Sequence, residues 1–279
     1  MIGADAGRAM HSGLSPADAP ANDRIRPGSV TNKRAPIPSA PMDAASHVIL
    51  LAQDGSGWWI ADLWQRGNTV LLASWLFWVL GSIVLHELGH GVAAIWQGDD
   101  TPRALGRMTI NPVVHMGWFS IIAFLLIGIA WGLMPVNPSR FRWGPRRGGA
   151  FVAAAGPAVN LVLCATCVIA CAAWQVASPR NEQLAGNVSV FLFTGAWLNL
   201  WLLMFNLLPV PPLDGASVIG GLSRGAARVM GDPRVQQFGF IAVLLLMFSG
   251  GASFAARLAN GTVATAIVTL VNAFSGSAA

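Results

Sequence analysis

Three residues in one short stretch of the chain could hold and use a metal ion. His86, Glu87 and His90 stand in the sequence His-Glu-Leu-Gly-His, inside a run whose composition favours a helix. Residues four apart lie on one helix face, about one turn from each other, so both imidazoles can bind the same ion. Glu87 is rotated by about 100° from His86, where it can take a proton from a water molecule at the metal. The pattern predicts a metal-dependent hydrolytic site, and a chance match is the weaker alternative.

A catalytic zinc ion needs a third protein ligand and one open coordination position. Asp99 and Asp100 follow the motif closely, but we expect them to be charges at the end of its helix. Glu182 lies in a polar stretch, where a solvated loop residue is the better interpretation. Asp214 is therefore the stronger candidate for the third ligand.

Asp214 follows a long apolar run in a stretch that Pro209, Pro211 and Pro212 interrupt. Proline has no backbone N–H and breaks a helix. Broken backbone at membrane depth occurs only where protein buries it or a water-filled cavity accepts it. A carboxylate in such a break suits a buried metal site. The alternative is a surface turn, in which Asp214 and Gly215 form ordinary turn chemistry.

The elements that must position these residues are membrane helices. The 279 residues are 54% hydrophobic and only 10% charged, whereas soluble domains average about 25% charged. The net charge of +5 comes mostly from arginines between apolar runs, which is typical of membrane topology rather than of nucleic-acid binding. We predict an all-α polytopic membrane protein with about five to six membrane segments and a broken helix at the metal site. The segments are expected at about 69–96, 117–136, 149–177, 189–209 and 235–250, with a weaker one at 262–274.

The N-terminal stretch and the three cysteines are interpreted as taking no part in the metal site. Residues 1–46 are rich in Ala, Pro, Ser, Asp and Arg, and we predict that they form a disordered tail before a membrane domain at 47–279. Cys164, Cys167 and Cys171 lie within one apolar run. We interpret these cysteines as helix-packing residues rather than as a metal cluster.

Together these motifs resemble the site-2 protease family of intramembrane zinc metalloproteases, and within it the compact bacterial members without PDZ or CBS domains. The resemblance covers about residues 69–250 in consistent order. Its matching positions are His86, Glu87, His90, Asn111, Pro112, His115, Pro135 to Pro138, Gly156 to Asn160, Asn206, Pro209, Leu213, Asp214 and Gly215. Close relatives commonly carry an aspartate where this chain has Gly117, and a lysine where it has Leu133 and Met134. These departures weaken the case for an accessory role of His115.

The resemblance implies one zinc ion per chain, bound by His86, His90 and Asp214, with Glu87 as the catalytic carboxylate. It implies an intramembrane zinc metalloendopeptidase of regulated intramembrane proteolysis, multi-pass in the bacterial cytoplasmic (inner) membrane. The expected partners are the lipid bilayer and a single-span membrane protein or signal-peptide-like substrate, and no nucleic acid.

Asn160 and Asn206 would, by the same resemblance, help to bind the substrate backbone or to hold the site. A catalytically silent zinc-binding membrane scaffold remains an alternative, because sequence cannot distinguish it from an active enzyme. A transporter would place polar residues in several helices. Here the charges within apolar segments concentrate in one ligand set, which argues against transport.

Shared coordination also constrains how the membrane segments run. His86 and His90 lie in the second half of one segment, and Asp214 lies at the end of another. All three ligands must reach one depth, so these two segments should run parallel. We therefore predict that 117–136 re-enters the membrane instead of crossing it, turning back at Gly128 or Gly132. With re-entry, most loop arginines flank the metal side, which would place that side in the cytoplasm. Five full spans would also give an arginine bias, with the N-terminus inside, so the arginines alone do not decide between the two topologies.

Overall fold

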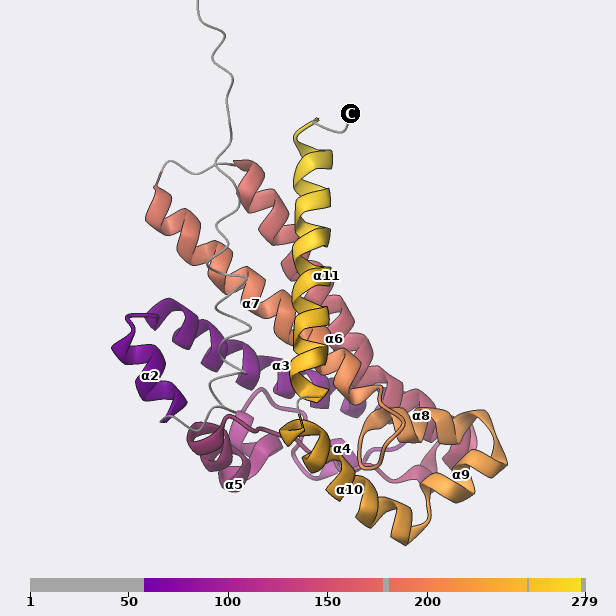
Figure 1. Ribbon diagram of the computed structural model, residues 1–279. Helices are drawn as coiled ribbons and strands as arrows, with labels where there is room; N and C mark the ends of the chain where they lie inside the picture. The colour runs from indigo at the N-terminus through magenta and orange to yellow at the C-terminus, as the bar shows by residue number, and fades with distance from the viewer. Residues whose placement is uncertain (1–57, 178–180, 250, 277–279) are drawn as a thin grey trace, which may run out of the picture. The chain divides into compact units, whose positions relative to one another are not determined.

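The computed structural model describes residues 58–177, 181–249 and 251–276, and within them the elements are helices joined by loops, without a β-strand. The predicted disordered tail at 1–46 lies outside the described residues. The elements (Figure 1) are α2 (Trp59–Gln65), α3 (Thr69–Trp96), α4 (Thr101–Ala104), α5 (Pro112–Ile127), the 3-10 turn η1 (Pro138–Arg140), α6 (Gly144–Ala177), α7 (Glu182–Asn206), α8 (Asp214–Leu222), α9 (Arg224–Met230), α10 (Pro233–Phe248) and α11 (Gly251–Phe274).

Four of the described helices are long and apolar enough to cross a membrane. They are α3, α6, α7 and α11, with 28, 34, 25 and 24 residues. At about 1.5 Å per residue even α11 reaches about 36 Å, which exceeds the roughly 30 Å hydrocarbon core of a bilayer. Helices α5 and α10 are also apolar but have 16 residues each. The prediction of an all-α polytopic membrane protein is confirmed.

The last long helix contains the predicted weaker segment 262–274 but begins earlier than the sequence predicts. The predicted segment 235–250 forms α10, which is too short to cross at 16 residues. The crossing helix is α11, of which only the second half was expected, as the weaker segment 262–274. Alanine, glycine and threonine make α11 only moderately apolar, whereas the Phe- and Leu-rich composition of α10 imitates a span.

The chain turns back after α5, as predicted. Helix α5 ends at Gly128, whose φ of 75° is the left-handed conformation that glycine adopts readily. The Trp131 N–H donates to Ser120 Oγ at 2.9 Å, and this hydroxyl donates to the Trp131 carbonyl at 2.7 Å. The Leu133 N–H donates to the His115 carbonyl at 3.0 Å. Residues 128–137, here called the return segment, therefore run back along α5 instead of continuing it.

Gly117 interrupts α5 near its first turns. Its backbone angles, φ 67° and ψ 162°, are not helical and lie in a region that side chains disfavour. Gly117 is one of the positions at which the sequence departs from the pattern that it resembles, and this departure coincides with a backbone conformation that suits glycine.

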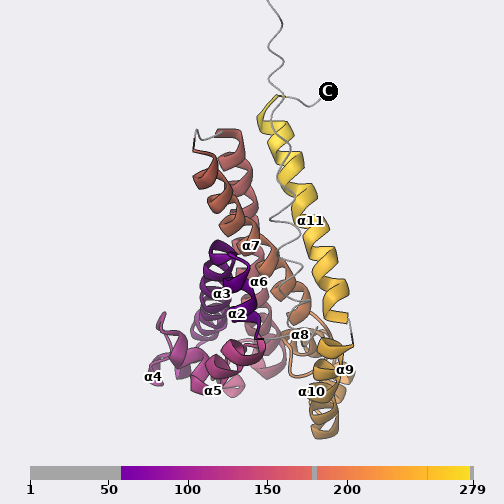
Figure 2. The same ribbon diagram turned by 60° about the vertical axis from the view of Figure 1, so that its left-hand side comes forward.

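Helix α6 is the element against which the site helices pack. It contacts α3, α7, α8 and α11, and α3 also contacts α7 (Figures 1 and 2). Small residues bring α3 and α6 close together. A Cβ at Gly89 would lie 2.8 Å from Val159 Cγ2 and 3.0 Å from the Ala155 carbonyl oxygen. This close approach, common between membrane helices, sets how near the metal motif lies to α6.

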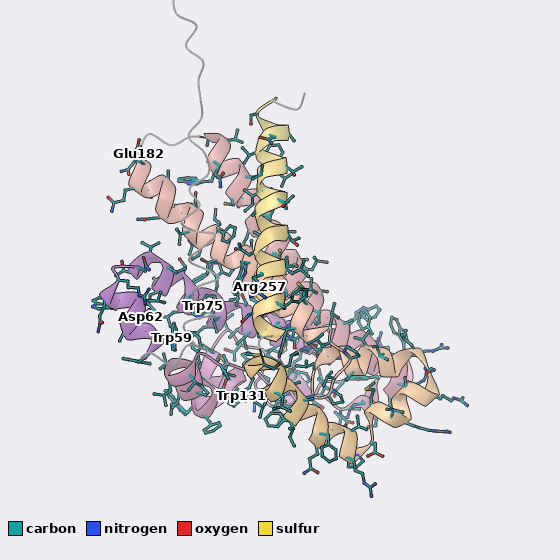
Figure 3. The ribbon with its side chains drawn as sticks, viewed as in Figure 1. Trp59, Asp62, Trp75, Trp131, Glu182 and Arg257 are labelled. Carbon is teal, nitrogen blue, oxygen red and sulfur yellow. The ribbon has the colours of Figure 1, made fainter. Side chains whose placement is uncertain are left out.

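A tryptophan-rich core joins the long helices. Trp75 of α3 (Figure 3) lies with its ring centroid 5.5 Å from that of Trp197, which is fully buried on α7. The Trp197 indole donates to the Ala256 carbonyl of α11 at 3.0 Å. Free thiols of α6 belong to the same core, namely Cys164, Cys167 and Cys171. The cysteines therefore pack against apolar side chains, in keeping with their interpretation from the sequence.

Asp99 connects the loop after α3 to the return segment. Its buried carboxylate accepts hydrogen bonds from the Asn137 N–H at 2.6 Å and from the Thr101 N–H and hydroxyl at 3.1 and 2.5 Å. Burial acts to raise the pKa of Asp99, but these hydrogen bonds and the charge of Arg140 outweigh it and hold the pKa below its ordinary value. Asp99, expected to be a boundary charge, is an anchor for the segment beside the site.

Asp99→Asn is expected to lower the free energy of unfolding by about 2 kcal/mol at neutral pH, because an amide accepts through one atom where the carboxylate accepts through two. A lowered pKa in the folded state stabilises the fold above the unfolded pKa of about 3.9, and this stabilisation is lost as the pH falls through the folded value. Thermal unfolding of the full chain should therefore separate the two proteins at pH 7, and the difference should shrink progressively as the pH falls below about 4. A difference that stays constant down to pH 3 would contradict the assignment. Asp100→Asn is the matched control, since that exposed carboxylate pairs with Arg103 on the surface.

Candidate metal centre

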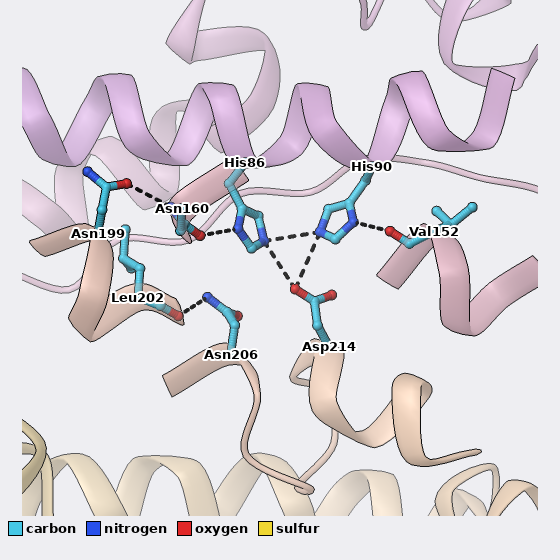
Figure 4. A network of polar contacts seen from close by, with 8 residues as sticks. All are labelled: His86, His90, Val152, Asn160, Asn199, Leu202, Asn206 and Asp214. Atoms are coloured by element: carbon cyan, nitrogen blue, oxygen red, sulfur yellow. Dashed lines mark hydrogen bonds and ion pairs between the residues drawn. The ribbon is translucent and has the colours of Figure 1, made fainter. Parts of the chain in front are cut away.

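His86 and His90 project from one face of α3 toward the same point (Figure 4). Both are buried, with 8% of each residue exposed. Their rings meet edge to face, with centroids 4.6 Å apart, and their Nε2 atoms are separated by 3.0 Å. The spacing of one helical turn therefore does what the sequence predicts and brings two imidazole nitrogens together.

Hydrogen bonds at the other ring nitrogens determine which atoms face inward. His90 Nδ1 lies 2.8 Å from the Val152 carbonyl oxygen, which can only accept, so the proton of this ring is on Nδ1. His86 Nδ1 lies 2.6 Å from Asn160 Oδ1, also an acceptor. Both Nε2 atoms consequently offer a lone pair to the same place.

Asp214 supplies a third candidate ligand from the first residue of α8. Its Oδ2 atom lies 3.1 Å from His86 Nε2 and 3.4 Å from His90 Nε2. Helix α7 has ended before the prolines, and the chain starts again as α8 at the aspartate. The Arg146 guanidinium holds α8 to α6 by donating to the Gly221 carbonyl at 2.6 Å. Among the described residues, this is the only group of three His, Cys, Asp or Glu side chains whose ligand atoms all lie within 4.8 Å of one another.

This arrangement of atoms fits a zinc ion. Asp214 Oδ2 is buried without a hydrogen-bond partner, and it faces two nitrogens whose protons are on the far side of their rings. Three electron-rich atoms 3.0 to 3.4 Å apart repel one another unless a cation lies among them. Tetrahedral zinc with bonds of about 2.0–2.2 Å separates its ligand atoms by about 3.3–3.6 Å, close to the spacing here. Three protein ligands leave one position open, as catalytic zinc requires.

Gly156 of α6 lies directly against the two histidine rings. A Cβ at this position would be 2.5 Å from His90 Nε2 and 2.6 Å from His86 Nε2, closer than side-chain atoms approach one another. The glycine therefore leaves the space in which the imidazoles meet. Gly156 is among the positions that carry the resemblance, but the sequence alone does not reveal this steric role.

Glu87 lies beside the ligands and under the return segment. Only 7% of the residue is exposed, and its charge interacts with His90, His86 and Asp214. A Cβ at Gly132 would be 2.5 Å from Glu87 Oε1, so the return segment passes directly over this carboxylate. Glu87 is thus next to the metal centre without belonging to the ligand set, which is the position that a general base requires.

The two asparagines of the predicted site differ in their surroundings. Asn160 is fully buried, and its amide contacts His86 on one side and Asn199 on the other. Asn206 is half-buried and donates to the Leu202 carbonyl at 3.0 Å, on the side from which Asp214 approaches the histidines (Figure 4). Binding of a substrate by either residue stays a prediction. Asn160, through its contact with His86, is placed to hold the site, which is the other role that the resemblance implies.

The remaining candidates lie apart from the ligand set. Glu182 is exposed at the start of α7, the opposite end of that helix from α8 (Figure 3). His115 is buried, and its Nε2 atom donates to the Thr109 carbonyl at 2.6 Å. Its Nδ1 atom has no hydrogen-bond partner among the described residues. His115 therefore helps to shape the start of α5 and does not join the metal ligands.

Comparison with known proteins agrees with this site. The profile of peptidase family M50 matches residues 74–178 and 173–250. A Bacillus subtilis protein named "Putative zinc metalloprotease YwhC" is 36% identical over 176 residues, which cover 62% of this chain and 79% of that protein. A Mycolicibacterium smegmatis protein named "Putative zinc metalloprotease Rip2" is 31% identical over 189 residues, which cover 64% of this chain and 67% of that protein. A Mycobacterium tuberculosis H37Rv protein with the same name is 28% identical over 204 residues, which cover 67% of this chain and 73% of that protein.

No solved structure matches the chain. The family profile nevertheless spans well over half of it and includes His86, Glu87, His90 and Asp214. The described fold supplies the apolar helices and the cation site that such an enzyme needs. This chain therefore belongs to peptidase family M50, the site-2 protease family of zinc metalloproteases.

Proposed function

We propose that this zinc metalloprotease cleaves membrane-spanning proteins at peptide bonds within or beside the bilayer. The observation that carries the proposal is the depth of the metal centre along a spanning helix. His86 and His90 lie 17 and 21 residues after the first residue of α3, and His90 is six residues before its last. At about 1.5 Å per residue the ligands are about 9–15 Å inside the end of that helix. A substrate that reaches them from within the membrane needs no large soluble domain to present it.

The chain's own residues can perform the hydrolysis in two proton transfers. Zinc held by His86, His90 and Asp214 would lower the pKa of a water that it binds from about 15.7 toward 7. Glu87 accepts a proton from the attacking water as its oxygen bonds to the scissile carbonyl carbon. Glu87 then returns the proton to the leaving amine as the C–N bond breaks. Cleavage thus consumes one water molecule and leaves Glu87 as it began.

A helical substrate must unwind before it can be cut, because its carbonyls are engaged in i→i−4 hydrogen bonds. The loop between α7 and α8 offers a place for the unwound stretch. Pro209, Pro211 and Pro212 leave backbone groups of this loop outside any helix. We propose that these groups pair with the extended substrate, in the manner of strand addition.

The proposed setting is the bacterial cytoplasmic (inner) membrane, with the chain crossing it several times. Its supports are the four long apolar helices and the bacterial sources of the named relatives. The proposed substrates are single-span membrane proteins or signal-peptide-like segments, cut in regulated intramembrane proteolysis. The spanning helices of such substrates lie at the depth proposed for the metal centre.

Reconstitution into liposomes with a single-span reporter tests this function. We expect cleavage sites, mapped by mass spectrometry, within or next to the reporter's spanning segment. Cleavage should stop when a chelator removes zinc and return when zinc is added. The same cut sequence in a soluble peptide is the control, and a chain that cleaves only this peptide would contradict intramembrane action. A chain that binds zinc but cuts no single-span reporter would instead be the catalytically silent scaffold.

A further inference from the structure

A line of hydrogen bonds runs from α7 through α6 to a metal ligand on α3. Asn199 Nδ2 donates to the Gly195 carbonyl at 2.9 Å, one turn earlier on α7. Asn160 Nδ2 donates to Asn199 Oδ1, also at 2.9 Å, and Asn160 Oδ1 lies 2.6 Å from His86 Nδ1. Both asparagines are fully buried (Figure 4). The side chains of Asn199, Asn160 and His86 therefore form a buried chain of hydrogen bonds, here called the relay, in which no proton transfer is implied.

Each amide in the relay has one orientation that satisfies its neighbours. The Gly195 carbonyl can only accept, so Asn199 must direct its NH2 group there and its oxygen toward Asn160. Asn160 must then direct its NH2 group to Asn199 and its oxygen to His86. If either amide turned over, two acceptors or two donors would face each other in a place without water to replace the lost bonds. A backbone carbonyl of α7 thus determines the direction of the whole relay.

We propose that Asn199 is a positioning residue of the metal centre. It holds the Asn160 amide so that His86 keeps its proton on Nδ1 and presents the Nε2 lone pair to the metal. Asn199 acts through Asn160, since its hydrogen bonds among the described residues go to Asn160 and Gly195 and to none of the metal ligands. The proposal concerns metal binding and does not depend on which peptide bonds the enzyme cleaves.

The contrast between the two histidines explains why the relay is needed. His90 donates to Val152 O, a backbone carbonyl that α6 itself holds in place. His86 instead contacts a side-chain amide, which can rotate and offer either oxygen or nitrogen. Without Asn199, the Asn160 amide can present its NH2 group and favour the tautomer with the proton on Nε2. That tautomer directs a proton at the metal position and cannot bind zinc.

Asn199→Leu in the full-length, detergent-solubilised chain tests the proposal. We expect the Kd for zinc, measured by competition with a chromophoric chelator, to rise about 10-fold, the lower end of the effect of losing such an outer partner. In the metal-free protein, ¹⁵N NMR of labelled histidines should show that His86 moves from the Nδ1–H tautomer to a mixture. Asn199→Ser provides a second variant should the leucine protein fail to fold. Its hydroxyl can still donate to the Gly195 carbonyl but is too short to hold Asn160, so we expect the same two changes.

Thr194→Val is the matched control. Thr194 is also buried on α7, and its hydroxyl donates to the Val190 carbonyl at 2.7 Å, a bond that stays within the helix. The control should retain the wild-type Kd and the wild-type His86 tautomer. An equal loss of affinity in this control would show a general packing effect and overturn the proposal.

A double-mutant cycle separates relay from packing. If Asn199 acts through Asn160, adding Asn199→Leu to Asn160→Leu should change the zinc Kd no further. Additive losses would mean that Asn199 acts on the site independently and would overturn the relay. An unchanged Kd and an unchanged His86 tautomer in both Asn199 variants would do the same.

Discussion

Glu87→Gln is expected to abolish peptide cleavage while the chain still binds one zinc ion. Glutamine keeps the shape of the side chain but cannot accept a proton at neutral pH, and a general base contributes about 10²- to 10⁴-fold to such a rate. The three candidate ligands are other residues, so their geometry should survive the change. Initial rates on a single-span reporter in liposomes, together with zinc content by mass spectrometry, measure both quantities.

Glu182→Gln is the natural control for this experiment. Glu182 is the other glutamate of the chain and lies exposed at the far end of α7, so its variant should cleave at the wild-type rate. In cells, comparison of membrane proteomes should show single-span precursors that accumulate with Glu87→Gln and not with Glu182→Gln. Retained cleavage by Glu87→Gln would remove Glu87 from the mechanism, and loss of zinc would show that it acts on the ligands instead.

Gly156→Ala is expected to prevent zinc binding, although alanine is the better helix former by about 1 kcal/mol. The added methyl group would lie 2.5 Å from His90 Nε2 and 2.6 Å from His86 Nε2. Ordinary carbon contacts are about 3.5–4.0 Å, so both rings would have to move by about 1 Å. Both ligands would move together, and we expect the zinc Kd to rise by at least 100-fold and cleavage to be lost with it.

Gly149→Ala distinguishes the local clash from a general effect on α6. It makes the same substitution on the same helix, where an added Cβ would meet no atom within 4 Å. We expect this control to bind zinc and cleave normally, and its thermal stability should equal or slightly exceed that of the wild type. Normal zinc affinity in Gly156→Ala would show that the histidines have more room than the structure gives them.

The sequence was sufficient for the parts of the fold that depend on hydropathy and on ligand geometry. A return at Gly128 or Gly132 followed from the need to bring Asp214 to the depth of the histidines, and the chain turns at Gly128. The last span was predicted too short and ranked below 235–250, because hydropathy favours large apolar side chains. Helix α10 has such side chains but is too short to cross. Helix α11 is built largely of small residues, which pack well but give a lower mean hydropathy.

The site likewise contains residues that local sequence signals predict and residues that they do not. His86, His90 and Asp214 were predictable because ligand types at helical spacing and a carboxylate at a broken helix are local signals. Asn199 was missed, although a polar residue inside an apolar segment is itself a signal of function. Gly156 could not be assigned a role from sequence, because its requirement for no side chain arises only when α6 meets α3.

Three supports of the metal centre come from successive turns of one helix. The Val152 carbonyl holds His90, Gly156 makes room for both rings, and Asn160 holds His86, at intervals of four residues along α6. These three contacts therefore fix the position of α3 along the axis of α6. If one helix moved along the other by a single turn, about 5.4 Å, all three contacts with the histidines would be lost together. Room for an incoming substrate must therefore open elsewhere, with the α3–α6 pair moving as one piece.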